Sequence, residues 1–282
     1  MRAFAVVVLT ALSLGANAAA TSAPSRNGLI AFARCCGFPG TGIYVIAPDG
    51  SGQRRLFQPK GDDAALWSAW SPDGTQIAFT PGAPRGGLWV MQANGARPHR
   101  ITAGKGEPGS PSWSGNGSRL VFSDSGSRAA FYDLYMVRAD GSGLRRVTST
   151  VANESSPAWA RDGRQIVYVR ERDLGRMRPD GTGQRLLLRD AQSPSWSPGG
   201  THLAFVRDSN PWIASRSGAG AKRVARVSTS FLAWSPDGQW LVTAAADRGD
   251  LMLIRTDGSR IRRLTHENGW FHASPSWQRI DN

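Results

Sequence analysis

The stretch Trp234-Ser235-Pro236-Asp237-Gly238-Gln239-Trp240-Leu241-Val242 decides the fold, because it returns at near-regular intervals along the chain. Other copies, which match this stretch more or less closely, contain the tryptophans Trp70, Trp113, Trp159, Trp196 and Trp277. The steps between the six tryptophans are 43, 46, 37, 38 and 43 residues. A fixed period of about 40 residues is typical of a propeller in which each repeat forms one four-stranded blade.

Each repeat predicts four short antiparallel strands, lettered A to D. The Trp ends strand A, and Ser-Pro-Asp-Gly is a turn, because Pro sets φ at the second position and Gly accepts a positive φ. The apolar triplet that follows, such as residues 77–79, is too short for a helix and suits a buried strand B. Residues 134–137 and 145–148 flank an Asp-Gly turn and give strands C and D. No helix-period pattern follows the N-terminal segment.

The two ends of the repeat region predict how the ring closes. The first repeat begins at a strand B over residues 29–32 and lacks a strand A, whereas Trp277 ends a surplus strand A at the C-terminus. Together they supply six copies of each strand. We therefore predict an all-β, six-bladed β-propeller of four-stranded antiparallel blades, with the C-terminal strand completing blade one. Closure leaves only short outer edges.

The N-terminus predicts export. Met1-Arg2, an apolar run over residues 3–14 and small residues at 16–20 form the pattern of a secretory signal peptide, with cleavage after Ala18 or Ala20. The apolar run is shorter than the roughly 20 residues that a membrane span needs. We expect a signal peptide at 1–20, one propeller domain at 21–282, no membrane span, and a periplasmic or secreted location.

The chain is strongly basic, with a formal net charge of +13 that comes almost entirely from arginine. Charge on an outer strand prevents edge-to-edge pairing. Predicted strands D carry Arg54, Arg55, Arg145, Arg146, Arg185, Arg262 and Arg263. A solvated, protective rim is one interpretation, and an anionic surface polymer of the cell envelope as partner is the other. The spread of arginine around the rim of an exported protein argues against nucleic acid.

The only two cysteines are neighbours, Cys35 and Cys36, in the predicted B–C loop of blade one. Export permits a disulfide, but adjacent residues bridge only through a strained eight-membered ring. Three interpretations stay open: a vicinal disulfide that forms a stiff apolar contact, two free thiols, and intermolecular or metal use.

The variable loops predict a functional face. The A–B and C–D turns are short and uniform, whereas the B–C loops and D–A crossovers vary and share the opposite face, where function concentrates on a rigid scaffold. Acids stand five to seven residues before the strand-A Trp, at Asp63, Glu107, Glu154 and Asp190. With Trp212, Trp270, Phe271 and His272 they are the predicted partner-binding residues. Ordinary solvated loop charge is the alternative, and the recurring Trp is expected to pack between blades.

Catalysis finds little support in the sequence. A Gly-x-Ser-x-Gly nucleophile elbow would need a helix to follow it, and no two histidines stand at zinc-ligand spacing such as His-Glu-x-x-His. We therefore expect no catalytic residue, no metal and no cofactor. The alternative is a metal-dependent sugar lyase or lactonase that uses the loop-face funnel, where clustered acids would hold Ca²⁺.

The repeats at residues 71–79 and 134–148 resemble the WD-repeat-like propeller of the TolB family, over essentially the whole predicted mature chain. The chain lacks the Gly-His and Trp-Asp dipeptides of true WD repeats, and its propeller begins almost directly after the predicted signal peptide. Full TolB carries an N-terminal α/β domain and binds a peptidoglycan-associated lipoprotein through its propeller. The resemblance implies an exported propeller of protein-binding type. We expect a non-catalytic, monomeric scaffold that binds a protein or peptide in the cell envelope or outside the cell.

Overall fold

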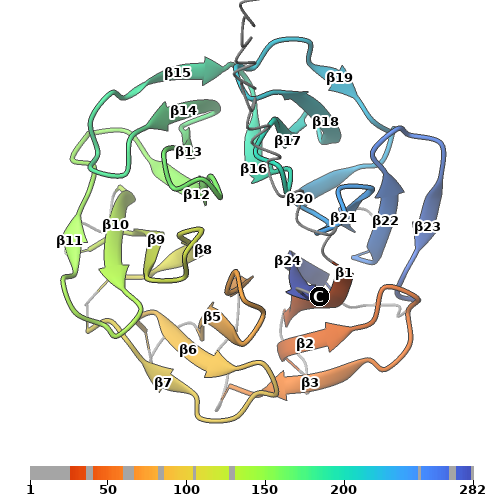
Figure 1. Cartoon of the computed structure of the whole chain (residues 1–282), viewed down its shortest axis with the longest axis horizontal. Helices are drawn as coiled ribbons and strands as arrows, with labels where there is room; N and C mark the ends of the chain where they lie inside the picture. The colour runs from red at the N-terminus through yellow and green to blue at the C-terminus, as the bar shows by residue number, and fades with distance from the viewer. Residues whose placement is uncertain are drawn as a thin grey trace, which may run out of the picture.

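The computed structural model describes residues 26–35, 41–59, 67–81, 86–103, 106–126, 131–246, 249–266 and 271–280. In these ranges the chain forms 24 strands and no helix, arranged as six four-stranded sheets around a central axis (Figure 1). The prediction of a six-bladed, all-β propeller is confirmed. The described residues contain no helix that is long and apolar enough to cross a membrane. The predicted signal peptide, Cys36, Asp63 and Trp270 lie outside the described residues.

Each blade runs outward from strand A at the channel to strand D at the rim (Figure 1). Blade one is β24 (Phe271–Ile280), β1 (Arg26–Cys35), β2 (Gly42–Ile46) and β3 (Arg54–Phe57), and blade two is β4 (Trp67–Trp70), β5 (Gln76–Thr80), β6 (Trp89–Gln92) and β7 (His99–Arg100). Blade three is β8 (Gly109–Trp113), β9 (Arg119–Asp124), β10 (Asp133–Arg138) and β11 (Arg145–Arg146), and blade four is β12 (Glu154–Trp159), β13 (Ile166–Arg170), β14 (Asp173–Met177) and β15 (Arg185–Leu188). Blade five is β16 (Gln192–Trp196), β17 (His202–Arg207), β18 (Asn210–Ser215) and β19 (Lys222–Arg223), and blade six is β20 (Thr229–Trp234), β21 (Trp240–Ala245), β22 (Leu251–Arg255) and β23 (Ile261–Arg263).

The ring closes as the surplus strand predicts. The C-terminal strand β24 pairs antiparallel with the N-terminal strand β1, from Arg26 opposite Ile280 to Cys35 opposite Phe271. Side chains extend the closure to the neighbouring blades. Asn27 Nδ2 donates to Asp237 Oδ2 of blade six at 2.8 Å, and Gln278 Nε2 donates to the Gly74 carbonyl of blade two at 2.9 Å.

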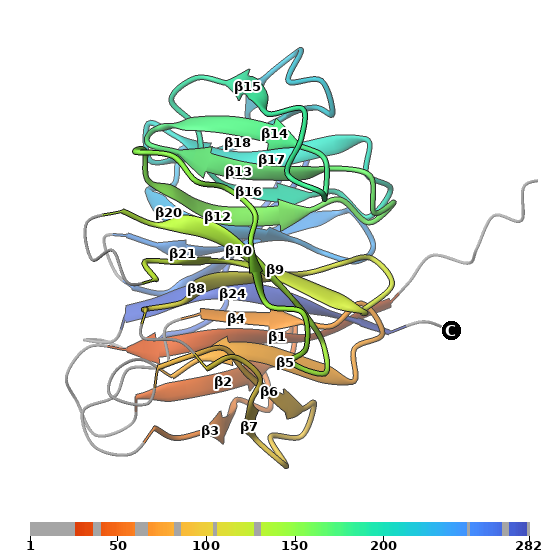
Figure 2. The same ribbon diagram turned by 90° about the vertical axis from the view of Figure 1, so that its left-hand side faces the viewer.

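The hydrophobic core lies between adjacent blades. One cluster joins blade-two residues such as Leu88 and Val90 to Leu120 and Phe122 of blade three. Trp113 belongs to the same cluster and is 7% exposed, which confirms packing between blades for this repeat tryptophan. Figure 2 shows the blades stacked face to face around the ring. Because every blade buries its apolar faces against two neighbours, the sheets are stable only as a closed set.

The strand-D arginines of blade three are bound into the structure. Arg146 pairs with the buried carboxylate of Asp133 at the start of strand C, and Arg145 Nη2 donates to the Pro179 carbonyl of blade four at 3.2 Å. The same two contacts recur in blade six. At these positions arginine ties a blade to itself and to its neighbour, in addition to the predicted protection of the rim.

The C–D turns also bring the blades into close contact. Gly95 has a φ of +88°, and a Cβ placed on it would lie 2.6 Å from the Leu56 carbonyl oxygen of blade one. Gly220, by contrast, has a φ of +66° and no atom within 4 Å of the same point. The first glycine therefore meets both a backbone and a packing requirement, and the second meets only the backbone requirement.

We expect Gly95→Ala to lower the free energy of unfolding by about 2–5 kcal/mol, from left-handed strain of about 1–2 kcal/mol and overpacking of about 1–3 kcal/mol. The matched control Gly220→Ala should cost only the strain. Urea unfolding of both variants measures the difference. Equal losses would show that the close contact between blades contributes nothing.

Candidate functional site: the channel mouth

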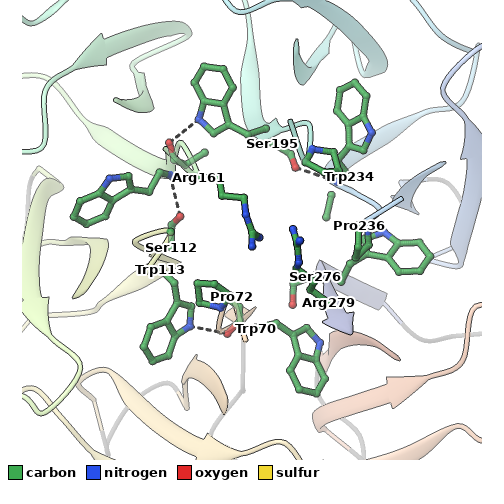
Figure 3. Close-up of a pocket in the computed structure, with 18 of the residues that line it drawn as sticks. Trp70, Pro72, Ser112, Trp113, Arg161, Ser195, Trp234, Pro236, Ser276 and Arg279 are labelled. Atoms are coloured by element: carbon green, nitrogen blue, oxygen red, sulfur yellow. Dashed lines mark hydrogen bonds between the residues drawn. The ribbon is translucent and has the colours of Figure 1, made fainter. Parts of the chain in front are cut away.

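A cavity of about 330 Å³ lies at the end of the central channel where the A–B turns gather, and all six blades line it (Figure 3). We call it the channel mouth. One ring of its lining stands two residues before each repeat Trp: Ser68, Pro111, Pro157, Pro194, Leu232 and Pro275. A second ring stands two residues after each Trp: Pro72, Gly115, Arg161, Pro198, Pro236 and Arg279.

A repeated backbone irregularity shapes the inner strands. Four serines directly before the lining prolines have φ between +47° and +48°, and the strand pairing is irregular beside each of them: Ser110, Ser156, Ser193 and Ser274. A left-handed residue other than glycine costs about 1–2 kcal/mol. Neighbouring blades hold the strands in place, since Ser193 Oγ donates to the Ser230 carbonyl at 2.6 Å and Trp234 N donates to Ser195 Oγ at 3.0 Å.

The repeat tryptophans form the wall behind the mouth. Trp113 Nε1 donates to the Ala69 carbonyl at 3.1 Å, and Trp196 Nε1 donates to the Ala158 carbonyl at 3.1 Å, each across a blade boundary. The indoles of Trp113 and Trp196 are therefore committed to contacts between blades. The surface offered to a ligand is made of proline rings, serine hydroxyls and the two arginines.

Arg161 and Arg279 dominate the charge of the channel mouth. They come from blades four and one, three blades apart in a ring of six, and Figure 3 shows both side chains extending into the channel toward each other. The described lining contains no acidic side chain. Guanidinium groups bind carboxylates through paired, charge-assisted hydrogen bonds. The mouth is therefore suited to a carboxylate held between opposite blades.

Sequence reasoning missed both arginines, although a signal for them existed. Arg161 and Arg279 occupy the position that is proline in three of the six copies of the turn motif. A comparison of each repeat with the consensus, position by position, would have singled them out. The variable-loop argument instead pointed to the opposite face of the propeller.

The predicted loop-face residues differ in exposure. Glu107, Asp190 and Phe271 are exposed, and Trp212 is half-buried beneath the Arg207 guanidinium, 5.3 Å from its ring centroid. A cavity of about 630 Å³ lies beside Asp190. Among the described residues no three His, Cys, Asp or Glu side chains gather into a group that could hold a metal ion. The partner-binding role of these residues stays a prediction.

Two of the predicted residues are buried in structural contacts. His272 is 3% exposed, its Nδ1 contacts the Gly249 carbonyl, and its ring packs edge-on against Phe32 with centroids 5.1 Å apart. Glu154 is fully buried, and its Oε1 accepts from Arg170 Nε at 2.9 Å and Nη2 at 2.6 Å. Neither side chain is available to a partner in this arrangement.

We expect Arg170→Met to lower the free energy of unfolding by about 3–5 kcal/mol, because it leaves the Glu154 carboxylate buried without its cation. The double variant Glu154→Gln/Arg170→Met removes that uncompensated charge and should recover most of the loss. Chemical denaturation of the single and double variants tests the coupling. A double variant no more stable than the single one would contradict it.

Asp124 and Tyr132 of blade three both have a raised pKa. Burial raises the pKa of Asp124; the Gly126 N–H, which donates to Oδ1 at 2.7 Å, opposes that shift, and the nearby Glu107 carboxylate adds to it. Burial and Glu107 also raise the pKa of Tyr132, whose hydroxyl lies 3.4 Å from Glu107 Oε2. Ionisation of the Asp124 carboxyl group therefore lowers the stability of the folded protein.

A raised carboxyl pKa stabilises the fold below the model-peptide value of 3.8, and that stabilisation is lost as pH rises through the folded-state pKa. Asp124→Asn, which keeps an acceptor for Gly126, should therefore gain stability relative to the native chain as pH rises through this window. Asp257→Asn is the control, because hydrogen bonds from the side chain and backbone of Ser259 lower the pKa of Asp257. Its relative stability should fall with rising pH, and thermal unfolding across the pH series measures both trends. The same trend in both variants would contradict the assignment.

The comparisons place the fold among TolB-like propellers. Residues 43–178 match the family model described as TolB beta propeller domain, PD40. TolB from Acinetobacter baumannii superposes with a TM-score of 0.76 at 19% identity, covering 89% of this chain and 66% of that one. A chain of the nidogen/laminin complex gives a TM-score of 0.73 at 11% identity, covering 89% of this chain and 98% of that one.

An oligogalacturonate lyase in complex with manganese gives a TM-score of 0.57 at 13% identity, covering 79% of this chain and 70% of that one. No curated protein matches the sequence. The chain is a six-bladed β-propeller that is similar to TolB in fold, and it spans 66% of the length of the Acinetobacter TolB. At these identities the structural likenesses define the fold alone.

Proposed function

We propose that this protein is an exported, non-catalytic propeller scaffold that binds a protein or peptide partner in the cell envelope or outside the cell. The channel mouth holds a carboxylate-bearing segment of that partner. The observation that carries this proposal is the pair Arg161 and Arg279, which extend toward each other from opposite blades into a lining of proline and serine.

The size of the mouth favours a chain segment over a folded domain. A cavity of about 330 Å³ accommodates a few side chains and lies at the lower end of the range of about 300–1,000 Å³ for ligand sites. An extended peptide that ends in a carboxylate, or that presents one Asp or Glu, would place its anionic group between the two guanidiniums. The proline rings would pack against the rest of the segment.

The rigidity of the ring supports binding. The inner strands are tied to each other by hydrogen bonds such as Trp159 N to Ser112 Oγ at 3.0 Å, so the mouth is formed before a partner arrives. A preorganised site avoids the entropic cost of ordering its own side chains and loops. The TolB-like fold agrees with a scaffold role. On the loop face, Asp190, Trp212 and Phe271 would supply secondary contacts.

The test compares capture from the native envelope fraction by the mature chain and by Arg161→Gln/Arg279→Gln. The double variant should lose at least about tenfold in affinity for the captured partner, since hydrogen bonds to charged groups contribute about 1.5–3 kcal/mol each. Arg54→Gln/Arg223→Gln is the matched control, because it removes the same charge from exposed outer strands. The control should bind as the native chain does. Titration with the captured partner's own peptides then identifies the segment.

Two results would contradict the channel-mouth proposal. Capture that survives the double variant but is lost in Asp190→Ala/Trp212→Ala/Phe271→Ala would move the site to the loop face. Retention of a divalent metal through dialysis, together with cleavage of an acidic polysaccharide, would replace the scaffold with the metal-dependent lyase alternative. The cavity beside Asp190 and the fold likeness to a lyase favour that alternative over other enzymes.

A further inference from the structure

Blade four departs from the repeat at one position of strand C. In the five other blades the residue opposite the equivalent position of strand D is apolar: Val45, Val90, Met136, Ile213 and Leu253. In blade four it is Arg176, and its partner across the strands is Arg185. Like charges directly opposite each other on one face destabilise a sheet. Blade four therefore carries a second positive charge where the five other blades have an apolar side chain.

The Arg176 guanidinium is also poorly satisfied within the protein. Its Nε is buried and has no hydrogen-bond partner. Burial, followed by the charges of Arg185 and Arg216, lowers the pKa of Arg176. A buried donor without an acceptor costs free energy. In the protein without a ligand, Arg176 is therefore unfavourable both because it faces Arg185 and because its Nε has no acceptor.

Arg176 lines a cavity of about 410 Å³ between blades four and five, which lie side by side in Figure 1. Its cationic lining consists of Arg164, Arg176, Arg178, Arg185 and Arg216. The described lining contains no acidic residue. We call this site the blade-four arginine pocket.

The fifth arginine of the pocket is held in position by its own contacts. Arg216 Nε donates to Gln165 Oε1 at 3.2 Å and Nη1 donates to Asp162 Oδ2 at 2.7 Å, and the guanidinium lies 5.4 Å from the Trp196 ring centroid. Two carboxylates stand close by, since Asp162 pairs with Arg216 and the Arg178 charge acts on Asp180. They leave the five guanidiniums with excess positive charge.

The positive surface continues past the pocket. An adjoining cavity of about 540 Å³ shares Arg164 and Arg178 and adds Arg119 and Arg145 from blade three. The pocket therefore lies within a field that favours multiply charged anions.

We propose that the blade-four arginine pocket binds a compact phosphate or diphosphate group that carries at least two negative charges. The planar fork of each guanidinium matches the oxygens of such a group in paired hydrogen bonds. A single carboxylate would leave most of the positive charge uncompensated. The bound anion would offset the repulsion between Arg176 and Arg185. It would also supply hydrogen-bond acceptors to the guanidinium groups of the pocket. The site lies between two blades and is independent of the channel mouth.

The test is calorimetric titration with inorganic pyrophosphate at constant ionic strength, for the native chain, Arg176→Met and Arg54→Met. Methionine is the residue that blade three carries at the Arg176 position, and Arg54 is the blade-one counterpart of Arg185. Arg176→Met should weaken pyrophosphate binding at least about tenfold and, without ligand, should raise the melting temperature. Arg54→Met should leave the binding unchanged, and acetate at the same ionic strength should not compete.

Weaker pyrophosphate binding together with a higher melting temperature in Arg176→Met would distinguish a ligand-binding role from a structural one. A lower melting temperature with unchanged binding would show that Arg176 is structural. Equal losses of binding in Arg176→Met and Arg54→Met would reduce the site to diffuse attraction around the rim, and competition by acetate would exclude a multivalent oxyanion. Arg185→Gln, which changes an exposed side chain of the pocket, provides a second measurement if Arg176→Met fails to fold.

Discussion

The pairing of the C-terminal strand β24 with the N-terminal strand β1 is the interaction on which the rest of the structure depends. Each blade buries its apolar faces only against its two neighbours, so an open ring would expose a full face of blade one and of blade six. The cluster that joins Ile30 and Phe32 to Val242 and Leu253 exists only because the ring is closed. Closure also places Arg279 at the channel, since that residue lies on the closing strand.

A repeated backbone makes departures from the repeat informative. Six copies of one turn and one hairpin give nearly the same backbone at every blade. Three blades have proline at the channel-mouth position, and five blades have an apolar residue at the strand-C position. Arg161 and Arg279 stand where the other blades have proline or glycine at the channel mouth, and Arg176 stands where the other blades have an apolar residue in strand C. Arg176 carries a cost that a ligand can offset, because it faces Arg185 and its buried Nε has no hydrogen-bond partner. Both proposed sites lie at departures from the repeat.

The acids of the crossovers show why spacing alone misleads. Glu107 and Glu154 stand at similar distances before their tryptophans, yet Glu107 is exposed and Glu154 is fully buried. The difference lies in the partner across the strands, because Glu154 pairs with Arg170 in the register of β12 and β13. A one-residue change of register reverses which face a side chain occupies, and sequence distance does not report register.

The sequence by itself determined the number of blades, the four strands of each, the turns and the closure of the ring. These features follow from local turn chemistry and from a period that each repeat carries within itself. Only the tertiary structure decided which residues meet across blades. Arg161 and Arg279 are 118 residues apart in the chain and face each other because blades four and one lie opposite each other in a ring of six. Arg176 and Arg216 share a pocket because consecutive blades pack face to face. Such contacts depend on the curvature of the whole ring, which no single repeat encodes.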